Sequence, residues 1–488
     1  MSDVPSIRVR ALNGAPERAG AAYVLYWMTA SRRLGWNFGL QRAVEAANDH
    51  DLPLVILEAL RTGYRWASDR VHAFVLDGMR EHEEALRGRA GVRYHPYVEP
   101  GEGAGSGLLG RLAERAAVVV TDDWPCFFLP RMQEVAAARL GVRVESVDAN
   151  GLYPMRDTRR VFPVAHAFRR HLQRTLGLHL ERLPARAPLE ALRSSATPAL
   201  PTGVVERWPD ASASLRSGGP DLAALPIDHA VGPVERRGGT AAGRARLRRF
   251  LSDGLDDYGR RRNEPEADAA SGLSPWLHFG HVSAHEIFSE IAARESWTPA
   301  SLSDDAEGKR HGWWGLPSAA EDFLDQLVTW RELGFNRCAH TDDYDRYESL
   351  PDWARATLEK HEGDDREHVY DLAAFDAAET HDELWNAAQV QLRREGRIHN
   401  YLRMLWGKKI LHWTESPRAA LEIMIELNNR YALDGRDPNS WSGIFWCLGR
   451  YDRAWGPERP VFGKVRYMSS DSTRRKYSVD GYVARYRP

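Results

Sequence analysis

Two tryptophans and three polar residues near the end of the chain have the types and spacing for redox chemistry. Trp406 and Trp413 lie seven residues apart in the stretch GRIHNYLRMLWGKKILHW. On a helix they would share a face with a rise of about 10 Å between them, a step across which an electron can hop. Asn400, Arg403 and Asp434 would line a pocket beside these rings.

A second candidate site is the run SGLSPWLHFGHVS at positions 271–283, which is rich in small and hydroxyl-bearing residues. Ser271 and Ser274 stand before Pro275, a residue suited to the first turn of a helix. Backbone N–H groups and serine hydroxyls at such a helix start can hold a diphosphate. The same serines can also be plain helix caps, and the sequence leaves both interpretations open.

The elements that position these residues belong to a chain of 488 residues, which is long enough for two or three domains. A hydrophobic content of 43% and a mean hydropathy of -0.51, with no apolar run of about 18 residues, indicate that this is not a membrane protein. The N-terminus lacks the apolar core of a secretion signal, so we expect a cytoplasmic protein. Cys126, Cys338 and Cys447 follow no metal-binding spacing, and we expect buried thiols and no metal site.

The overall charge gives no general attraction to nucleic acid, since the formal net charge is -2 and the sequence pI is about 6.8. A local basic face is nevertheless possible, because Arg459 to Pro488 holds eight basic residues against Asp471 and Asp480. Such a cluster alone is more often solvated surface. Seventeen tryptophans, as many as tyrosines, favour roles beyond core packing.

Residues 21 to 150 alternate apolar runs with amphipathic segments, which predicts a doubly wound parallel sheet. The apolar runs expected as strands cover residues 21–28, 52–60, 92–99, 116–123 and 142–149, with helices from about Trp36, from Trp66 to Arg89, before residue 116 and from about Pro130. Ligands of such sheets bind beyond the carboxyl ends of the strands.

A long connection rich in Pro, Ala, Ser and Gly follows, and the pattern after it is helical. Helices are expected at about 282–295, 319–334, 382–394, 397–412 and 417–428, and Leu247, Phe250, Leu251, Leu255 and Tyr258 form one buried stripe. We therefore predict an α/β domain over 1–165, a linker over 166–240 and a mostly α-helical domain over 241–488.

Together, these motifs resemble the DNA photolyase and cryptochrome superfamily, and most closely the class II cyclobutane-pyrimidine-dimer photolyases. The resemblance covers nearly the whole chain, densely from about 245 to 480 and weakly before that. It implies an α/β doubly wound antenna domain and an α-helical domain that binds FAD in a bent form. It also makes an 8-hydroxy-deazaflavin antenna plausible in the first domain.

The resemblance assigns cofactor roles to several residues. Tyr258 stands at the position of the flavin-phosphate tyrosine, Arg403 and Asp434 match the buried ion pair beside the flavin ring, and Asn428 faces the reactive N5. Without the resemblance, Asn428 would be interpreted as part of a helix C-terminus. The cofactor-binding residues implied in this way are Tyr258, Ser271, Gly272, Leu273, Ser274, Asn400, Arg403, Asn428, Asp434 and, as a weaker candidate, Asn439.

The resemblance also assigns an electron relay. Trp406 would lie nearest the flavin ring, Trp385 next and Trp413 near solvent. In most proteins any one of these indoles would serve packing alone.

The substrate wall departs from the family pattern. FLDQLVTWREL, positions 323–333, matches the class II signature helix, but Gln326 replaces a glutamate that steadies the dimer radical anion. An amide cannot supply a carboxyl proton. Trp330, Met404 and Trp446 match wall positions, and Tyr451 replaces a family histidine.

The sequence leaves three functions open. The first is light-driven repair of damaged DNA by a monomer, with a flipped pyrimidine dimer as substrate. The second is a blue-light receptor that keeps FAD and the relay without repair, which Gln326 favours. The third is a dark electron-transfer flavoprotein, which would need neither Trp330 nor a basic surface.

Overall fold

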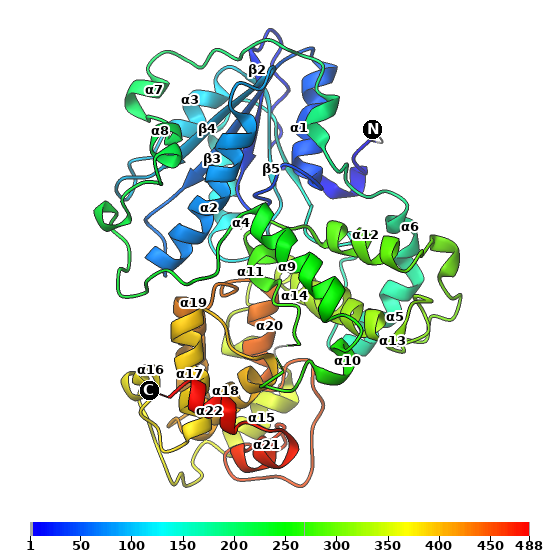
Figure 1. The fold of residues 1–488 in the computed structure, drawn as a ribbon, viewed down its shortest axis with the longest axis vertical. Helices are drawn as coiled ribbons and strands as arrows, with labels where there is room; N and C mark the ends of the chain where they lie inside the picture. The colour runs from blue at the N-terminus through cyan, green and yellow to red at the C-terminus, as the bar shows by residue number, and fades with distance from the viewer. Residues whose placement is uncertain (1–2, 268, 488) are drawn as a thin grey trace. The chain divides into compact units, whose positions relative to one another are not determined.

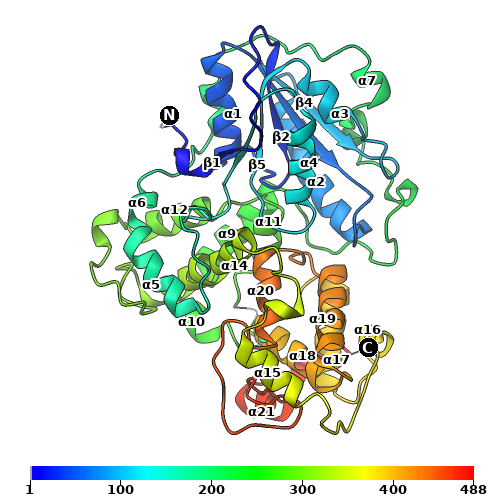
Figure 2. The same ribbon diagram turned by 180° about the vertical axis from the view of Figure 1, so that it is seen from behind.

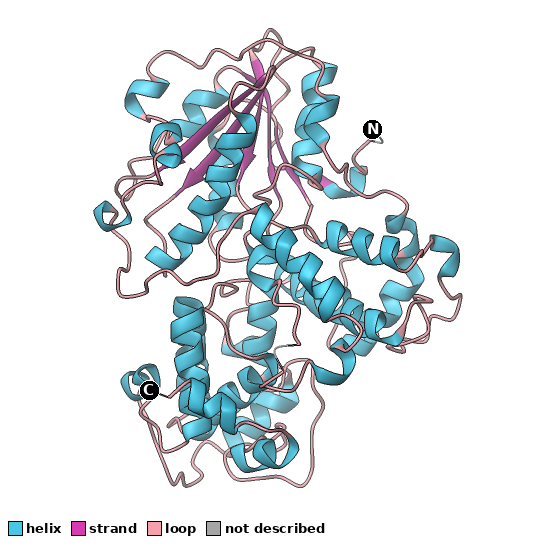
Figure 3. Cartoon of the chain, in the orientation of Figure 1, coloured by secondary structure: helices cyan, strands magenta, loops and turns pink. Residues whose placement is uncertain are grey.

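The computed structural model describes residues 3–267 and 269–487, and these form two compact units. The first unit comprises Met1–Thr158, Leu176–Arg248 and Leu273–Pro299, and the second comprises Arg159–Thr175, Arg249–Gly272 and Ala300–Pro488. Strands occur in the first unit, whereas the second is helical (Figure 3). This is the predicted fold class, an α/β part followed by a mostly α-helical part.

The first unit is built on a six-stranded sheet in the order β1-β6-β5-β2-β3-β4 (Figure 1). All neighbours are parallel except β1 and β6, which are antiparallel. The sequence predicted every strand but β1, whose three residues are too few for a readable pattern. The strands are β1 (Val9–Ala11), β2 (Tyr23–Met28), β3 (Leu54–Leu60), β4 (Val92–Val98), β5 (Ala116–Asp122) and β6 (Val144–Val147).

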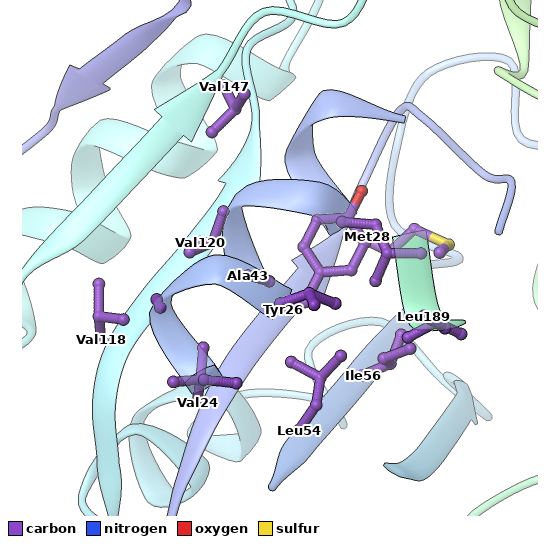
Figure 4. Packing of buried hydrophobic residues seen from close by; sticks show 14 of the residues in the cluster. Val24, Tyr26, Met28, Ala43, Leu54, Ile56, Val118, Val120, Val147 and Leu189 are labelled. Atoms are coloured by element: carbon purple, nitrogen blue, oxygen red, sulfur yellow. The ribbon is translucent and has the colours of Figure 1, made fainter. Parts of the chain in front are cut away.

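Alternate residues of β2 bury on opposite faces of the sheet, as the period of a strand requires. Val24, Tyr26 and Met28 pack with helix α1 (Phe38–Asp49), as Figure 4 shows. Tyr23, Leu25 and Trp27 share the other core with α3 (Leu108–Ala113) and α4 (Leu129–Arg139). Both faces are therefore covered, and the strands read as continuous apolar runs.

The carboxyl ends of β2 and β5 are held together by one carboxylate. Asp122 accepts hydrogen bonds from the backbone N–H groups of Thr29, Ala30 and Ser31 at 2.8, 2.8 and 3.0 Å. The Tyr26 hydroxyl donates to the same side chain at 2.6 Å. A protein side chain thus satisfies the donors at the point where the strand order reverses.

The proline-rich segment contributes to the core of the first unit. Its Leu189 packs on one face of the sheet, and Val204 and Trp208 pack on the other. The division into domains at 165 and 240 stays a prediction, because compactness alone does not define a domain. The remaining helices of this unit are η1 (Ser6–Arg8), α2 (Asp69–Leu86), α6 (Gly177–Leu180), η2 (Pro188–Ala191), α7 (Val204–Arg207), α8 (Ser212–Arg216), η3 (Leu222–Ala224), α11 (Ser274–His278) and α12 (Ala284–Arg294).

The helices of the second unit lie close to the predicted positions, and Figure 2 shows α17, α18 and α19 side by side. They are α5 (Ala165–Thr175), α10 (Tyr258–Arg261), α13 (Ser318–Leu324), the π-helix η5 (Asp325–Trp330), α14 (Arg331–His340), η6 (Tyr347–Ser349), α15 (Asp352–Lys360), α16 (Leu372–Ala377), α17 (Glu383–Glu395), α18 (Asn400–His412), α19 (Pro417–Tyr431), α20 (Pro438–Trp446), α21 (Ser470–Lys476) and α22 (Asp480–Arg485). α9 (Thr240–Asp253) and η4 (Pro299–Ser301) cross the division between the units. No helix in the described part of the chain is long and apolar enough to span a membrane.

Candidate functional site

The structure brings the three candidate relay tryptophans into one row on α17 and α18. The rings of Trp406 and Trp385 lie 6.4 Å apart and nearly parallel, and those of Trp385 and Trp413 lie 6.3 Å apart at 70°. Trp385 therefore stands between the other two. The shared helix alone suggested a direct step from Trp406 to Trp413, whereas the rings lie in the order Trp406, Trp385, Trp413 that the resemblance implied, with two steps through α17.

Hydrogen bonds hold the row in place. The Trp385 indole N–H donates to the backbone carbonyl of Trp406 at 3.0 Å, and the Trp406 indole donates to Oε1 of Gln389 at 3.0 Å. All three indoles are buried, with exposed fractions of 0%, 3% and 2% for Trp385, Trp406 and Trp413. Fixed, buried rings suit electron transfer, because little solvent must reorganise when a charge moves.

The outer end of the row differs from the expectation that Trp413 lies near solvent. Trp413 is buried, and the half-buried Tyr370 ring lies 6.0 Å beyond it. The Tyr370 hydroxyl is 2.8 Å from Nδ1 of His381, an exposed residue whose backbone N–H donates to the same hydroxyl. Desolvation and the neighbouring His368 lower the pKa of His381, so its neutral ring can accept the tyrosine hydrogen bond. Sequence reasoning missed Tyr370, because nothing local links it to Trp413.

The polar residues expected around a cofactor lie on α18, α19 and the loop after α19. Arg403 pairs with Asp434 at 3.1 Å, but their side chains are 23% and 14% exposed, so the pair is partly rather than fully buried. Asn428 is buried and donates to Ser440 Oγ at 2.7 Å. Asn400 is exposed at the start of α18.

The weaker candidate Asn439 is exposed, and its backbone N–H is capped by Asp437. The polar residues that sequence reasoning missed are Gln389 and Asn429. Each is fully buried and has a side-chain nitrogen without a hydrogen-bond partner among the described residues.

The residues of the expected diphosphate turn are assigned to different units. Ser271 and Gly272 belong to the second unit, and Leu273 and Ser274 belong to the first. Leu273 is the N-cap of α11 and Ser274 its first residue, so neither serine is the N-cap of that helix. In the second unit, Tyr258 is buried against aromatic rings, and burial raises its pKa.

A cavity of about 940 Å³ in the second unit contains all three predicted wall residues, Trp330, Met404 and Trp446. Tyr401, Trp455 and Tyr467 add further aromatic surface. The basic residues of its lining are Arg169, Arg310, Arg453, Arg459, Arg466 and Lys476, and the lining acid Asp452 is paired with Arg466 at 2.8 Å. The cavity therefore suits a flat ligand that carries negative charge.

The π-helix η5 carries Trp330 into this wall. Asp325, at its start, is buried and pairs at 2.7 Å with Arg169, a cavity residue. Gln326 is half-buried and, within the described residues, is not part of the cavity lining. π-turns inside helices often mark functional sites, because they shift the side chains that follow.

Comparison with known proteins yields relatives along the full chain. The sequence is 34% identical over 481 residues to a deoxyribodipyrimidine photo-lyase of Methanothermobacter thermautotrophicus, which covers 98% of both chains. It is 33% identical over 496 residues to one of Oryza sativa subsp. japonica, covering 98% of this chain and 90% of that one.

Among solved structures, a bacterial class III photolyase from Agrobacterium tumefaciens matches 97% of this chain and 88% of its own with a TM-score of 0.66 and 17% identity, which shows a shared fold. No protein-family model matches the sequence.

Proposed function

Because this chain belongs to the DNA photolyase and cryptochrome superfamily, we propose that it is a class II type enzyme that uses light to split cyclobutane pyrimidine dimers in DNA. A dimer flips from the duplex into the cavity, which costs least for a lesion that is already poorly stacked. Trp330 and Trp446 supply flat walls for the two bases, and the basic lining holds flanking phosphates. The observation that carries this proposal is a cavity whose lining is both aromatic and cationic.

The residues beside the relay fit FAD. Gln389 already accepts a hydrogen bond from Trp406, so its unpaired amide nitrogen lies near the indole that we place closest to the flavin ring. A buried donor without a partner is costly unless a ligand satisfies it. Within the second unit, the residues proposed to hold the cofactor are Tyr258, Ser271, Gly272, Gln389, Asn400, Arg403, Asn428 and Asp434.

When bound and reduced, FAD supplies the photoexcited electron donor for ring splitting. The chain's own part is to keep that donor supplied: electrons pass inward through Trp413, Trp385 and Trp406. Tyr370 extends this path toward solvent. As an electron leaves Tyr370, its hydroxyl proton passes to Nδ1 of His381, so no positive charge stays on the tyrosine.

An 8-hydroxy-deazaflavin antenna in the first unit is part of the proposal. The loops after β3 and β5 bring Tyr64, Trp66 and Phe127 together, with ring separations of 5.9 to 6.2 Å. These loops follow the carboxyl ends of strands that flank β2, the usual ligand position of such sheets.

The test is an absorption spectrum of the purified protein followed by a repair assay. We expect flavin bands, and restoration of a dimer-containing oligonucleotide under blue light with a reductant present. A protein that is colourless and takes up no flavin on reconstitution would refute the proposal.

The alternative is a blue-light receptor without repair, which the amide of Gln326 and its place outside the cavity lining favour. Flavin photoreduction without restoration of the oligonucleotide selects this alternative.

A further inference from the structure

Lys408, in the middle of α18, is a fully buried cation that neither the relay nor the cavity lining uses. Its ammonium donates to the backbone carbonyl of Cys447 at 2.7 Å and lies 4.9 Å from the ring centre of Trp446. Among the described residues, no carboxylate forms an ion pair with it.

Such a charge is expensive to bury. Taking an ammonium out of water without a counter-ion costs several kcal/mol, and the usual response is a lowered pKa. Burial lowers the pKa of Lys408 to about 8. A methionine would fill the same space without this cost, so the positive charge itself needs an explanation.

The position of the Lys408 ammonium explains why a charge is present here. Trp446 lines the cavity, and Lys408 lies against its ring without lining the cavity. Met404, one turn earlier on α18, also lines the cavity. The ammonium is thus one side chain away from the cavity, and because it is fully buried its field is weakly screened.

We propose that Lys408 stabilises the negative charge that arrives when a pyrimidine dimer, bound against Trp446, takes up an electron. This inference rests on the proposed function. With reduced FAD as the photoexcited donor, the dimer would gain one electron; two carbon–carbon bonds of its cyclobutane ring would then break, and the dimer would return the electron to the donor. Lys408 keeps its proton throughout, so it acts as a positioning residue through its charge.

The amide at position 326 gives a further argument for a buried positive charge near the dimer. Position 326 carries an amide, which cannot steady the dimer anion by giving a proton. A fixed cation behind the wall achieves part of the same stabilisation without proton transfer.

The groups around Lys408 allow its titration to be measured without interference from theirs. The groups that face it are Cys447, Asp452 and Arg466, with Arg403 near Cys447. Burial raises the pKa of Cys447 to about 11, and hydrogen bonds from Arg466 help to keep Asp452 ionised. In this group Lys408 alone changes charge between about pH 7 and 9.5, and it is charged below its pKa.

The experiment compares wild type, Lys408→Met and Lys408→Arg in single-turnover repair of a thymine-dimer oligonucleotide with pre-reduced protein. We expect Lys408→Met to repair about tenfold more slowly, with oligonucleotide affinity changed less than about twofold, and Lys408→Arg to retain the rate. Wild-type repair falls as pH rises through a midpoint at or above about 8, because bound phosphates raise a lysine pKa further. Lys360→Met, at an exposed lysine outside the cavity lining, is the matched control.

A second measurement needs no flavin. The fluorescence emission of Trp446 in the apoprotein is obtained by subtracting the spectrum of a Trp446→Phe variant. This emission should shift between pH 6.5 and 9.5 in wild type and should not shift in Lys408→Met. The inference is overturned if Lys408→Met repairs at the wild-type rate. It is also overturned if Lys408→Arg loses as much activity as Lys408→Met and the wild-type repair rate does not change with pH. A wild type that repairs no dimer at any pH refutes the proposed function instead, while the emission shift still reports the charge beside Trp446.

Discussion

Trp385 contacts both of the other relay indoles, so a single substitution there separates the two ends of the relay. In the proposed relay its position, between rings 21 and 28 residues later in the chain, makes it the residue on which flavin reduction would depend. In the proposed function, repair by protein that is already reduced would not use this path.

Trp385→Phe tests this role. Phenylalanine keeps an apolar ring but is much harder to oxidise, and the loss of one step should slow flavin photoreduction at least about tenfold. Repair by chemically reduced protein should stay close to wild type. Transient absorption after a light flash measures both, with Trp208→Phe in the first unit as control; equal photoreduction in wild type and Trp385→Phe would contradict the relay order.

Lys408 also gives a prediction for stability. In the unfolded chain a lysine has its ordinary pKa of 10.5, whereas the folded value is about 8. Between these values the unfolded chain binds more protons, so wild-type stability rises with pH across this window. Relative to Lys408→Met, wild type should gain about 2 kcal/mol between pH 7 and 9.5, measured by urea unfolding. A constant difference between the two proteins would mean that Lys408 is not buried as a cation.

At the scale of elements, the π-helix η5 connects the wall to the rest of the second unit. Its Asp325 is 5% exposed and holds Arg169 of α5, which is 9% exposed. The pair fixes the start of the turn that ends at Trp330. A buried pair is weak evidence for stability, but breaking it leaves a buried charge.

Asp325→Asn should therefore destabilise the protein by about 3 kcal/mol and weaken binding of a dimer-containing oligonucleotide. The matched control is Glu348→Gln, which breaks the exposed pair with Arg418 and should destabilise the protein far less. Urea unfolding and fluorescence anisotropy measure the two effects. Equal losses in both variants would show that the pair does not hold η5.

At the scale of the whole molecule, a net charge of -2 coexists with a cavity lined by six basic side chains. In the proposed function, DNA affinity would come from this local charge and should fall steeply with salt. The predicted basic segment contributes Arg459, Arg466 and Lys476 to the cavity.

Lys476→Gln should lower the slope of log affinity against log salt by about one and weaken damaged and undamaged DNA alike. Lys360→Gln, at an exposed lysine paired with Glu458, should leave the slope unchanged. Filter binding at several salt concentrations gives both slopes. An unchanged slope for Lys476→Gln would remove Lys476 from the phosphate contacts.

The sequence by itself predicted every strand but β1 and the main helices, because their periods are local properties of the chain. It proposed candidate site residues mainly through the family resemblance, and it missed Tyr370, Gln389 and Asn429. Only the tertiary structure decided which of these residues meet. It set the distances of the Trp385 ring from those of Trp406 and Trp413, buried Trp413 behind Tyr370, and, within the described residues, left Gln326 out of the cavity lining.

The neighbouring lysines of α18 show the reason most clearly. Lys408 faces Trp446 and Lys409 faces Trp413, each at 4.9 Å from the ring centre. Adjacent helix positions point about 100° apart. Lys409 meets a ring four residues later at the end of its own helix, whereas Lys408 meets Trp446 of α20, which only the packing of the fold brings near. Burial and charge environment are therefore properties of the packed fold, which no local pattern contains.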